Sequence, residues 1–292
     1  MKAIRIPETY NYIACFLTFD CNYRCSYCIN YFGKNRLHAK ALSGREWVKG
    51  LNRIVSRDDL PITLQGGEPS LHPDFVSIIN AIKPEIQLDI LTNLQFDVKE
   101  FARRVSPKRL KRGSPYASIR VSYHPEVMKL DELIAKTLFL TERGFSVGIW
   151  GVVHPKYEQA IYEAREECAR RGIDFRTKEF LGTYRNKLYG QYKYRGAFDG
   201  HNRGVQCKTT EVIIGPDGSI YRCHSDCYHH RNPIGNILDN NFQIKDTFRP
   251  CNRFGDCNPC DLKWPKFDRF QQSGHCSVEI VFEAPTRREA AH

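Results

Sequence analysis

The sequence predicts an α/β protein in which a partial (β/α)6 TIM-like barrel over residues 1–180 is followed by a small cysteine-rich α+β domain. Two observations predict this fold class. Up to about residue 180, short apolar runs alternate with amphipathic ones, which is typical of strand–helix units around a parallel sheet. Beyond that point the pattern changes, and seven of the twelve cysteines lie from Cys207 onward. With 292 residues, 41% of them hydrophobic, the chain can bury a sizeable core.

Six short runs rich in β-branched or aromatic residues predict the barrel strands at 12–18, 62–65, 86–91, 117–123, 145–153 and 173–180. The amphipathic segments between them predict helices over 44–56, 73–83, 97–105, 131–143 and 157–171. Ser43 precedes the first helix as an N-cap, with Glu46 as its capping-box partner. Gly144 and Gly172 each follow a basic last turn, so we expect them to end helices. The functional face of such a barrel lies at the C-terminal ends of its strands.

The rest of the chain divides into three predicted parts. Residues 181–206 are rich in glycine, tyrosine and basic residues and are expected to be a linker or insertion. Residues 207–282 form the cysteine-rich domain, in which 211–214 and 219–223 flank the turn signal Gly215-Pro216-Asp217-Gly218 and predict a hairpin. Residues 283–292 are polar and are expected to be a flexible tail.

The charge balance and the first residues restrict the partners and the compartment. Lys and Arg total 44 against 33 Asp and Glu, and the net charge of +11 favours an anionic partner, either a phosphorylated small molecule or a nucleic acid. No signal peptide and no apolar run long enough to span a bilayer is visible, so we expect a cytoplasmic protein without a membrane partner. Because cytosolic thiols stay reduced, the cysteines are expected to hold metal rather than form disulfides. Cys15 and Cys168, inside a predicted strand and helix, are expected to be buried apolar residues.

Three cysteines, Cys21, Cys25 and Cys28, follow the first predicted strand directly. Three thiolates at this spacing on one loop can converge on a single iron–sulfur cluster, and since such a cube normally takes four thiolates, one iron would keep an open position. The alternative is a zinc knuckle that borrows a distant fourth ligand.

The second predicted strand ends in Gln65-Gly66-Gly67-Glu68-Pro69, at the same rim of the barrel. The two glycines allow a ligand to approach the backbone closely, and the Glu68 carboxylate could receive an ammonium group. Alone, this motif is only a weak indication of a binding site. It becomes informative because the cysteine loop lies at the same rim, one strand–helix unit earlier.

With these two motifs, residues 12–180 resemble the radical S-adenosylmethionine (SAM) enzymes. The resemblance implies that Cys21, Cys25 and Cys28 hold a [4Fe–4S] cluster whose open iron is chelated by SAM. It also implies SAM contacts from these residues: Gly66, Gly67 and Glu68 for the amino group, Asn93 and Ser122 for the ribose or carboxylate, and Tyr27, Trp150 and Val152 for the adenine. Such an enzyme takes one electron from an external donor of the flavodoxin or ferredoxin type, cleaves SAM to a 5′-deoxyadenosyl radical and abstracts hydrogen from a substrate C–H.

A second cysteine set consists of Cys207, Cys223 at the end of the hairpin, and the later pair Cys257 and Cys260. Four cysteines in this arrangement are typical of a zinc ribbon. After a barrel of this kind the set resembles the twitch domain, the shortened SPASM extension, which implies a second, auxiliary [4Fe–4S] cluster held by these four cysteines. The two further closely spaced cysteines of a full SPASM domain are missing, and Cys227, Cys251 and Cys276 stay unassigned.

Three classes of function remain open from the sequence. The first is a net oxidation or rearrangement of a small anionic metabolite, phosphorylated or sugar-like, with the auxiliary cluster as electron acceptor. The second is a maturase that crosslinks or oxidises a ribosomally made peptide, which is disfavoured because we expect no leader-recognition domain before Cys21. The third is an RNA-modifying enzyme, which rests on charge alone. His224, beside Cys223, and Glu179, at the end of the sixth strand, are the candidate catalytic bases.

Overall fold

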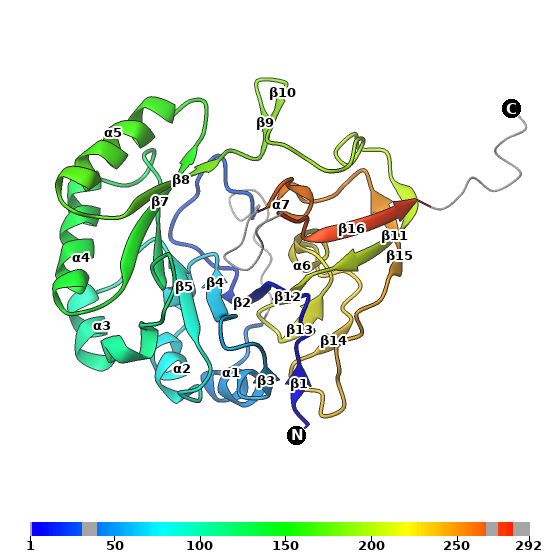
Figure 1. Ribbon diagram of the computed structural model, residues 1–292, viewed down its shortest axis with the longest axis horizontal. Coiled ribbons are helices and arrows are strands. Elements are labelled where there is room, and N and C mark those ends of the chain that lie inside the picture. Colours follow the sequence, from blue (N-terminus) through cyan, green and yellow to red (C-terminus); the bar gives the residue numbers. More distant parts are fainter. Residues whose placement is uncertain (1, 31–39, 267–273, 283–292) are drawn as a thin grey trace, which may run out of the picture.

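A computed structural model describes residues 2–30, 40–266 and 274–282 (Figure 1). Its centre is a sheet with the strand order β14-β13-β12-β2-β4-β5-β6-β7-β8. The last six form the partial barrel and run parallel to their neighbours. Their bounds are β2 (Tyr12–Thr18), β4 (Ile62–Gly66), β5 (Leu88–Thr92), β6 (Ile119–Tyr123), β7 (Val147–Val153) and β8 (Phe175–Glu179). The predicted α/β fold and its six parallel strands are therefore confirmed.

The barrel helices follow the strands in the predicted order: α1 (Gly44–Leu51), α2 (Phe75–Ala81), α3 (Val98–Arg104), α4 (Leu130–Glu142) and α5 (Glu158–Arg170), with the short 3-10 turns η1 (Pro69–Leu71) and η2 (Pro107–Leu110). Ser43 and Glu46 form the expected capping box. Gly144 and Gly172 have φ angles of 85° and 71°, which is the left-handed conformation expected after a helix end.

The first helix is shorter than the predicted 44–56. It ends at Leu51, and Ile54–Val55 form strand β3, which pairs in parallel with β1 (Ile4–Arg5). Arg53 is buried between the two segments and donates from Nε to the carbonyl oxygen of Lys2 at 2.8 Å. Pairing with the N-terminal strand, which suits the β-branched side chains of Ile54 and Val55, therefore ends the helix before its predicted bound.

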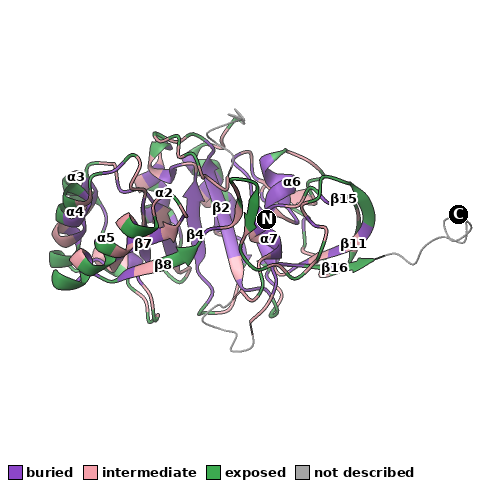
Figure 2. Cartoon of the chain, turned by 90° about the horizontal axis from the view of Figure 1, so that it is seen from above, coloured by how far each residue is buried: buried purple, intermediate pink, exposed green. Residues whose placement is uncertain are grey.

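One apolar core fills the space between the sheet and the helices, with Leu64, Ile90 and Val121 of the strands against Trp47 and Ile78 of the helices. Figure 2 shows the exposed class along the outer sides of α3, α4 and α5 and the buried class in β2 and β4. Strands alternate the direction of their side chains, so the residues between these core positions face the inside of the barrel.

The C-terminal part of the chain is joined to the barrel through backbone pairing. In β12 (Glu211–Ile214), Ile213 pairs with Ala14 of β2 in a parallel register, and β13 (Ser219–Tyr221) and β14 (Gly235–Asn236) continue the same sheet. The predicted hairpin thus extends the barrel sheet beyond its first strand. The domain boundaries at 180/181 and 206/207 remain predictions from the sequence.

A three-stranded antiparallel sheet of β11 (Arg203–Thr209), β15 (Arg249–Phe254) and β16 (Val278–Phe282) completes the C-terminal part, together with the short helices α6 (His224–Tyr228) and α7 (Pro259–Leu262). Within the expected linker, β9 (Gly182–Tyr184) and β10 (Lys187–Tyr189) form a small hairpin. The predicted tail over 283–292 lies outside the described residues. In the described part of the chain, every helix is too short or too polar to cross a bilayer.

Candidate functional site

A cavity of about 700 Å³ occupies the inside of the barrel. It extends from the residues before the strands, such as Asn11 and Leu60, to the loops after them. Its lining includes every SAM contact predicted above, the three cysteines of the first loop and both candidate bases: Cys21, Cys25, Tyr27, Cys28, Gly66, Gly67, Glu68, Asn93, Ser122, Trp150, Val152, Glu179 and His224. Residues predicted from separate motifs therefore share one space of the size of a ligand pocket.

The loop after β2 presents its three thiols to this cavity. Cys21, Cys25 and Cys28 are half-buried. Burial, with Cys28, Glu126 and Cys21 nearby, raises the pKa of the Cys25 thiol to about 12. Such a thiol is neutral until a metal displaces its proton. Three half-buried thiols at the rim of a cavity fit a cluster that keeps one position open for a ligand.

Glu126, in the loop after β6, anchors the cysteine loop. Its carboxylate accepts hydrogen bonds from the Ser26 backbone N–H at 2.6 Å, from Ser26 Oγ at 2.8 Å and from the Tyr157 hydroxyl at 2.8 Å. Burial alone would raise the pKa of Glu126, but the bonds from Ser26 and Tyr157 hold it below its ordinary value. Glu126 is not among the residues predicted from the sequence. Its place directly after a barrel strand, at the functional rim, was the available signal.

Aromatic side chains form the wall beside the cysteine loop. The ring of Tyr27 stacks on His154 with centroids 5.0 Å apart, and its hydroxyl lies 3.1 Å from Nδ1 of His124. Burial lowers the pKa of His124 to about 4, so this imidazole is neutral near pH 7. Asn93 Nδ2 donates to Oδ1 of Asn22 at 2.7 Å, which ties the end of β5 to the cysteine loop.

The two glycines after β4 are required by the fold itself. A Cβ on Gly66 would lie 2.3 Å from the Thr18 carbonyl oxygen, and one on Gly67 would lie 2.2 Å from that of Asp20. Because neither glycine has a Cβ, the loops after β2 and β4 can run side by side. The Gly67 N–H donates to the Thr18 carbonyl oxygen at 2.9 Å. The glycines therefore bring the cysteine loop against the second strand.

The expectation that the Glu68 carboxylate receives an ammonium group needs correction. This side chain is 1% exposed, and its oxygens accept hydrogen bonds from Ser70 N and Oγ, Thr92 Oγ1 and Asn93 N at 2.6–3.1 Å. Burial raises the pKa of Glu68, and these bonds oppose the rise. The carboxylate thus joins β4 to β5.

Basic side chains also line the cavity: Arg120, Arg176, Lys178, Lys263 and Lys266. Most have an acidic partner: Arg120 Nη2 lies 3.4 Å from Asp89 Oδ2, Lys263 Nζ lies 2.9 Å from Glu179 Oε1, and Lys266 is paired with Glu211. Lys178 has no ion pair or hydrogen bond to any described residue. Enclosure within the cavity lowers its pKa to about 8, with further contributions from Arg120, Lys266 and Lys263.

The two candidate bases differ in their surroundings. His224 is 5% exposed and reaches the cavity from the start of α6. Its Nδ1 lies 2.7 Å from Oδ1 of Asp261, which leaves Nε2 as the ring nitrogen able to exchange a proton with a bound molecule. Asp261 also accepts from the His224 backbone N–H at 3.0 Å. The carboxylate of Glu179, by contrast, forms an ion pair with Lys263.

The C-terminal cysteines are only partly grouped as predicted. Cys207, Cys223 and Cys257 line a second, small cavity of about 30 Å³ together with Cys251, whereas Cys260 lines the barrel cavity. Cys276 is buried, with its Sγ 3.2 Å from the Val278 carbonyl oxygen, and Cys227 is buried in a neighbouring apolar cluster. Among residues 2–30, 40–266 and 274–282, no three Cys, His, Asp or Glu side chains are arranged to hold a single metal ion.

Comparison with known proteins connects this geometry to a family. Residues 16–112 match the model of the radical SAM superfamily. A GTP 3′,8-cyclase of Nautilia profundicola is 32% identical over 183 residues, covering 59% of this chain and 56% of that protein. A probable GTP 3′,8-cyclase of Thermococcus kodakarensis is 36% identical over 118 residues, covering 39% of this chain and 36% of the relative. The chain thus spans about half the length of the first relative and about a third of the length of the second.

Two solved structures share the fold. "Native anSMEcpe with bound AdoMet" superposes with a TM-score of 0.55 at 13% identity, covering 78% of each chain. The same protein with bound AdoMet and a Kp18Cys peptide superposes with a TM-score of 0.54 at 13% identity and the same coverage. At this identity the likeness concerns the arrangement of strands and helices.

Proposed function

Given the radical SAM domain that this chain carries, we propose that the protein cleaves SAM reductively and abstracts hydrogen from a C–H bond of a small anionic substrate, in a net oxidation or rearrangement. The observation that carries this proposal is the single cavity, which is lined by the cysteine loop, by the predicted SAM contacts and by a group of cations. A bound cluster with SAM supplies one-electron reduction and the 5′-deoxyadenosyl radical. The protein supplies position, charge and exclusion of water.

At the rim, the chain's own residues hold the reacting groups in place. Cys21, Cys25 and Cys28 are the cluster ligands, and Glu126 fixes their loop through Ser26. The backbone around Gly66 and Gly67 would receive the amino group of SAM, and Asn93 and Ser122 would contact the ribose or carboxylate. Tyr27, Trp150 and Val152 would contact the adenine, and all of these residues line the cavity.

Within the same cavity, the cations would select the substrate. Arg120 on β6 and Arg176 and Lys178 on β8 line the cavity from the two strands that flank β7, and a phosphate or carboxylate placed there gains charge-assisted hydrogen bonds. Lys178 has no acidic partner among the described residues, so it loses no ion pair when an anion binds. The name of the relatives, GTP 3′,8-cyclase, supports a phosphorylated nucleotide as the first substrate to test.

His224 is the better of the two candidate bases. Asp261 fixes the orientation of its ring, and Nε2 remains to take the proton that an oxidation releases. Glu179 is paired with Lys263, so we assign it to the cavity wall rather than to proton transfer. An auxiliary [4Fe–4S] cluster in the C-terminal part would accept the electron left on the substrate, and an external flavodoxin- or ferredoxin-type donor would supply the first electron.

Reductive turnover tests the proposal. Anaerobically reconstituted protein is incubated with dithionite, SAM and deuterated candidates from three classes, namely nucleotides and sugar phosphates, peptides, and RNA. Transfer of deuterium into 5′-deoxyadenosine with a phosphorylated small molecule is the expected result. Transfer from a peptide or an RNA would replace the substrate class by one of the sequence-based alternatives. If no candidate increases SAM cleavage and the iron content stays near zero, the enzyme proposal itself fails.

A further inference from the structure

The Cys257–Cys260 pair is divided between two cavities, and this division carries an inference about the C-terminal metal site. The pair was expected to supply two ligands to one centre. Cys257 lines the small cavity with Cys207 and Cys223, whereas Cys260 lines the barrel cavity with Tyr12, Lys178 and Lys266. The groups whose charges act most on Cys260 are Lys266, Glu211, Asp261 and Lys178, and none is a cysteine.

The local backbone explains the division. Helix α7 begins between the two cysteines, with Asn258 as its N-cap and the Asn258 Oδ1 accepting from the Cys260 backbone N–H at 2.9 Å. Cys257 precedes this helix and Cys260 lies in its first turn, so no helical face holds the two side chains together. The two thiols line different cavities.

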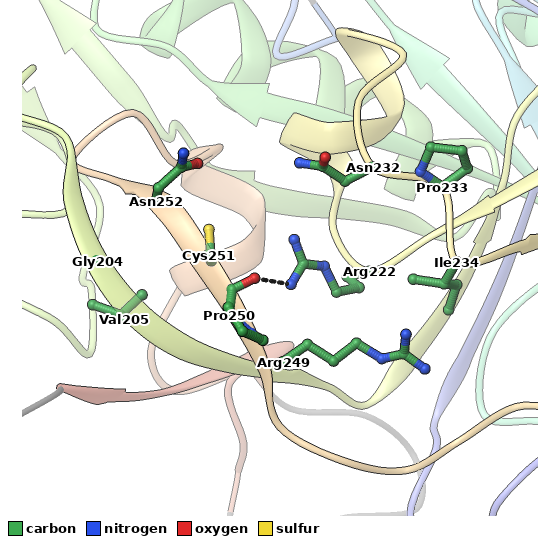
Figure 3. A pocket seen from close by; sticks show the side chains of 10 residues that line it. All are labelled: Gly204, Val205, Arg222, Asn232, Pro233, Ile234, Arg249, Pro250, Cys251 and Asn252. Carbon is green, nitrogen blue, oxygen red and sulfur yellow. Dashed lines mark hydrogen bonds between the residues drawn. The ribbon is translucent and has the colours of Figure 1, made fainter.

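Cys251, rather than Cys260, lines the small cavity with the other three cysteines. It pairs with Val205 across β11 and β15, and cross-strand partners point to the same face of a sheet. Cys207 lies two residues beyond Val205 on β11 and so faces the same side. The thiols of Cys207 and Cys251 are within hydrogen-bonding reach of each other. Figure 3 shows Cys251 on its strand next to Pro250, whose carbonyl oxygen accepts a bond from Arg222.

The remaining contacts of this group are compatible with a thiolate site. Cys223, the N-cap of α6, accepts from the Asp226 backbone N–H at 3.3 Å, a bond that favours its thiolate. Arg222 and Arg253 also line the small cavity and bring positive charge near the four sulfurs. The donor set of four cysteines is soft, as iron–sulfur clusters and zinc both require.

We infer that the auxiliary metal centre is held by Cys207, Cys223, Cys251 and Cys257, and that Cys260 is a free thiol of the substrate cavity. This inference rests on the auxiliary centre of the proposed function. It replaces one ligand of the sequence-based set and places a thiol in the barrel cavity near Lys178, which has no ion pair with any described residue.

Two measurements test the inference. In the first, native holoprotein without SAM is treated anaerobically with iodoacetamide, and the alkylated cysteines are identified by mass spectrometry. Cys260 is expected to react, while Cys251 reacts only after the metal is removed and the chain unfolded. Protection of Cys260 or early reaction of Cys251 overturns the assignment. This measurement needs no variant to fold.

The second measurement uses full-length protein in which Cys21, Cys25 and Cys28 are replaced by Ala, so that only the C-terminal centre remains. Iron, sulfide and zinc are counted in this background and after adding Cys251→Ser or Cys260→Ser, with circular dichroism to confirm folding. Cys260→Ser is expected to keep the metal and Cys251→Ser to lose most of it; any other order refutes the inference. A background protein without metal refutes the auxiliary centre instead, and zinc without sulfide refutes its iron–sulfur identity.

Discussion

The anchor between Glu126 and the cysteine loop can be tested by removing the carboxylate with Glu126→Ala. Three hydrogen bonds are lost, two to Ser26 and one to Tyr157. A bond to a charged group contributes roughly 1.5–3 kcal/mol when dry, and since Glu126 is partly exposed we take about 1 kcal/mol for each. Only the two bonds from Ser26 join the carboxylate to the loop, so about 2 kcal/mol enters the equilibrium between ordered and open loop, which is a factor of about thirty because about 1.4 kcal/mol is a factor of ten.

Hydrogen exchange of metal-free protein measures this directly. The Ser26 amide, which donates to Glu126, is expected to exchange about thirtyfold faster in Glu126→Ala and about fivefold faster in Glu126→Gln, which keeps one acceptor oxygen. The reconstituted variant should also lose iron from the loop more rapidly to a chelator. Glu163→Ala is the matched control, since that exposed carboxylate accepts only from Gln159 on its own helix. Unchanged exchange at Ser26 in Glu126→Ala would refute the anchoring role.

Three further predictions concern the cavity and its frame. Lys178→Met should raise the KM for a phosphorylated substrate roughly tenfold or more while leaving substrate-free SAM cleavage unchanged. Because the lysine is charged below its pKa of about 8, the wild-type KM should rise as pH increases through that value, whereas in Lys178→Arg it should stay flat; a rise of equal size in both would exclude Lys178 as the titrating group. His224→Asn should slow product formation about a hundredfold or more but leave 5′-deoxyadenosine release near the wild-type rate, and parallel loss of both would point to a structural role. Gly67→Ala, whose Cβ would lie 2.2 Å from a backbone oxygen, should lower the free energy of unfolding by about 3 kcal/mol in urea titrations, while Gly113→Ala, with nothing within 4 Å, should be neutral.

The parts of this fold that the sequence predicts are those decided by neighbours along the chain. The capping box at Ser43, the glycines after α4 and α5 and the six apolar strands depend on local pattern, and all are present. The cysteine loop and the Gly66-Gly67-Glu68 segment were placed at the same rim because parallel strands end together. These features needed no knowledge of distant contacts.

The features that the sequence did not predict depend on contacts between distant segments. The start of α7 between Cys257 and Cys260 depends on a single cap residue, and the proximity of Cys251 to Cys207 depends on the register of two strands that lie more than 40 residues apart. Likewise, the hydrogen bonds that occupy the Glu68 carboxylate come from the end of the next strand. Spacing alone carries no information about any of them.

The parallel pairing of β12 with β2 has a consequence for biosynthesis. Ile213 lies beside Ala14, so one neighbour of β2 leaves the ribosome about 200 residues after the strand itself. Until then one edge of an apolar strand stays open, and open edges invite pairing with other chains. A nascent or truncated chain that stops before Glu211 should therefore depend on chaperones to stay monomeric, even though it contains the six strands and five helices of the barrel.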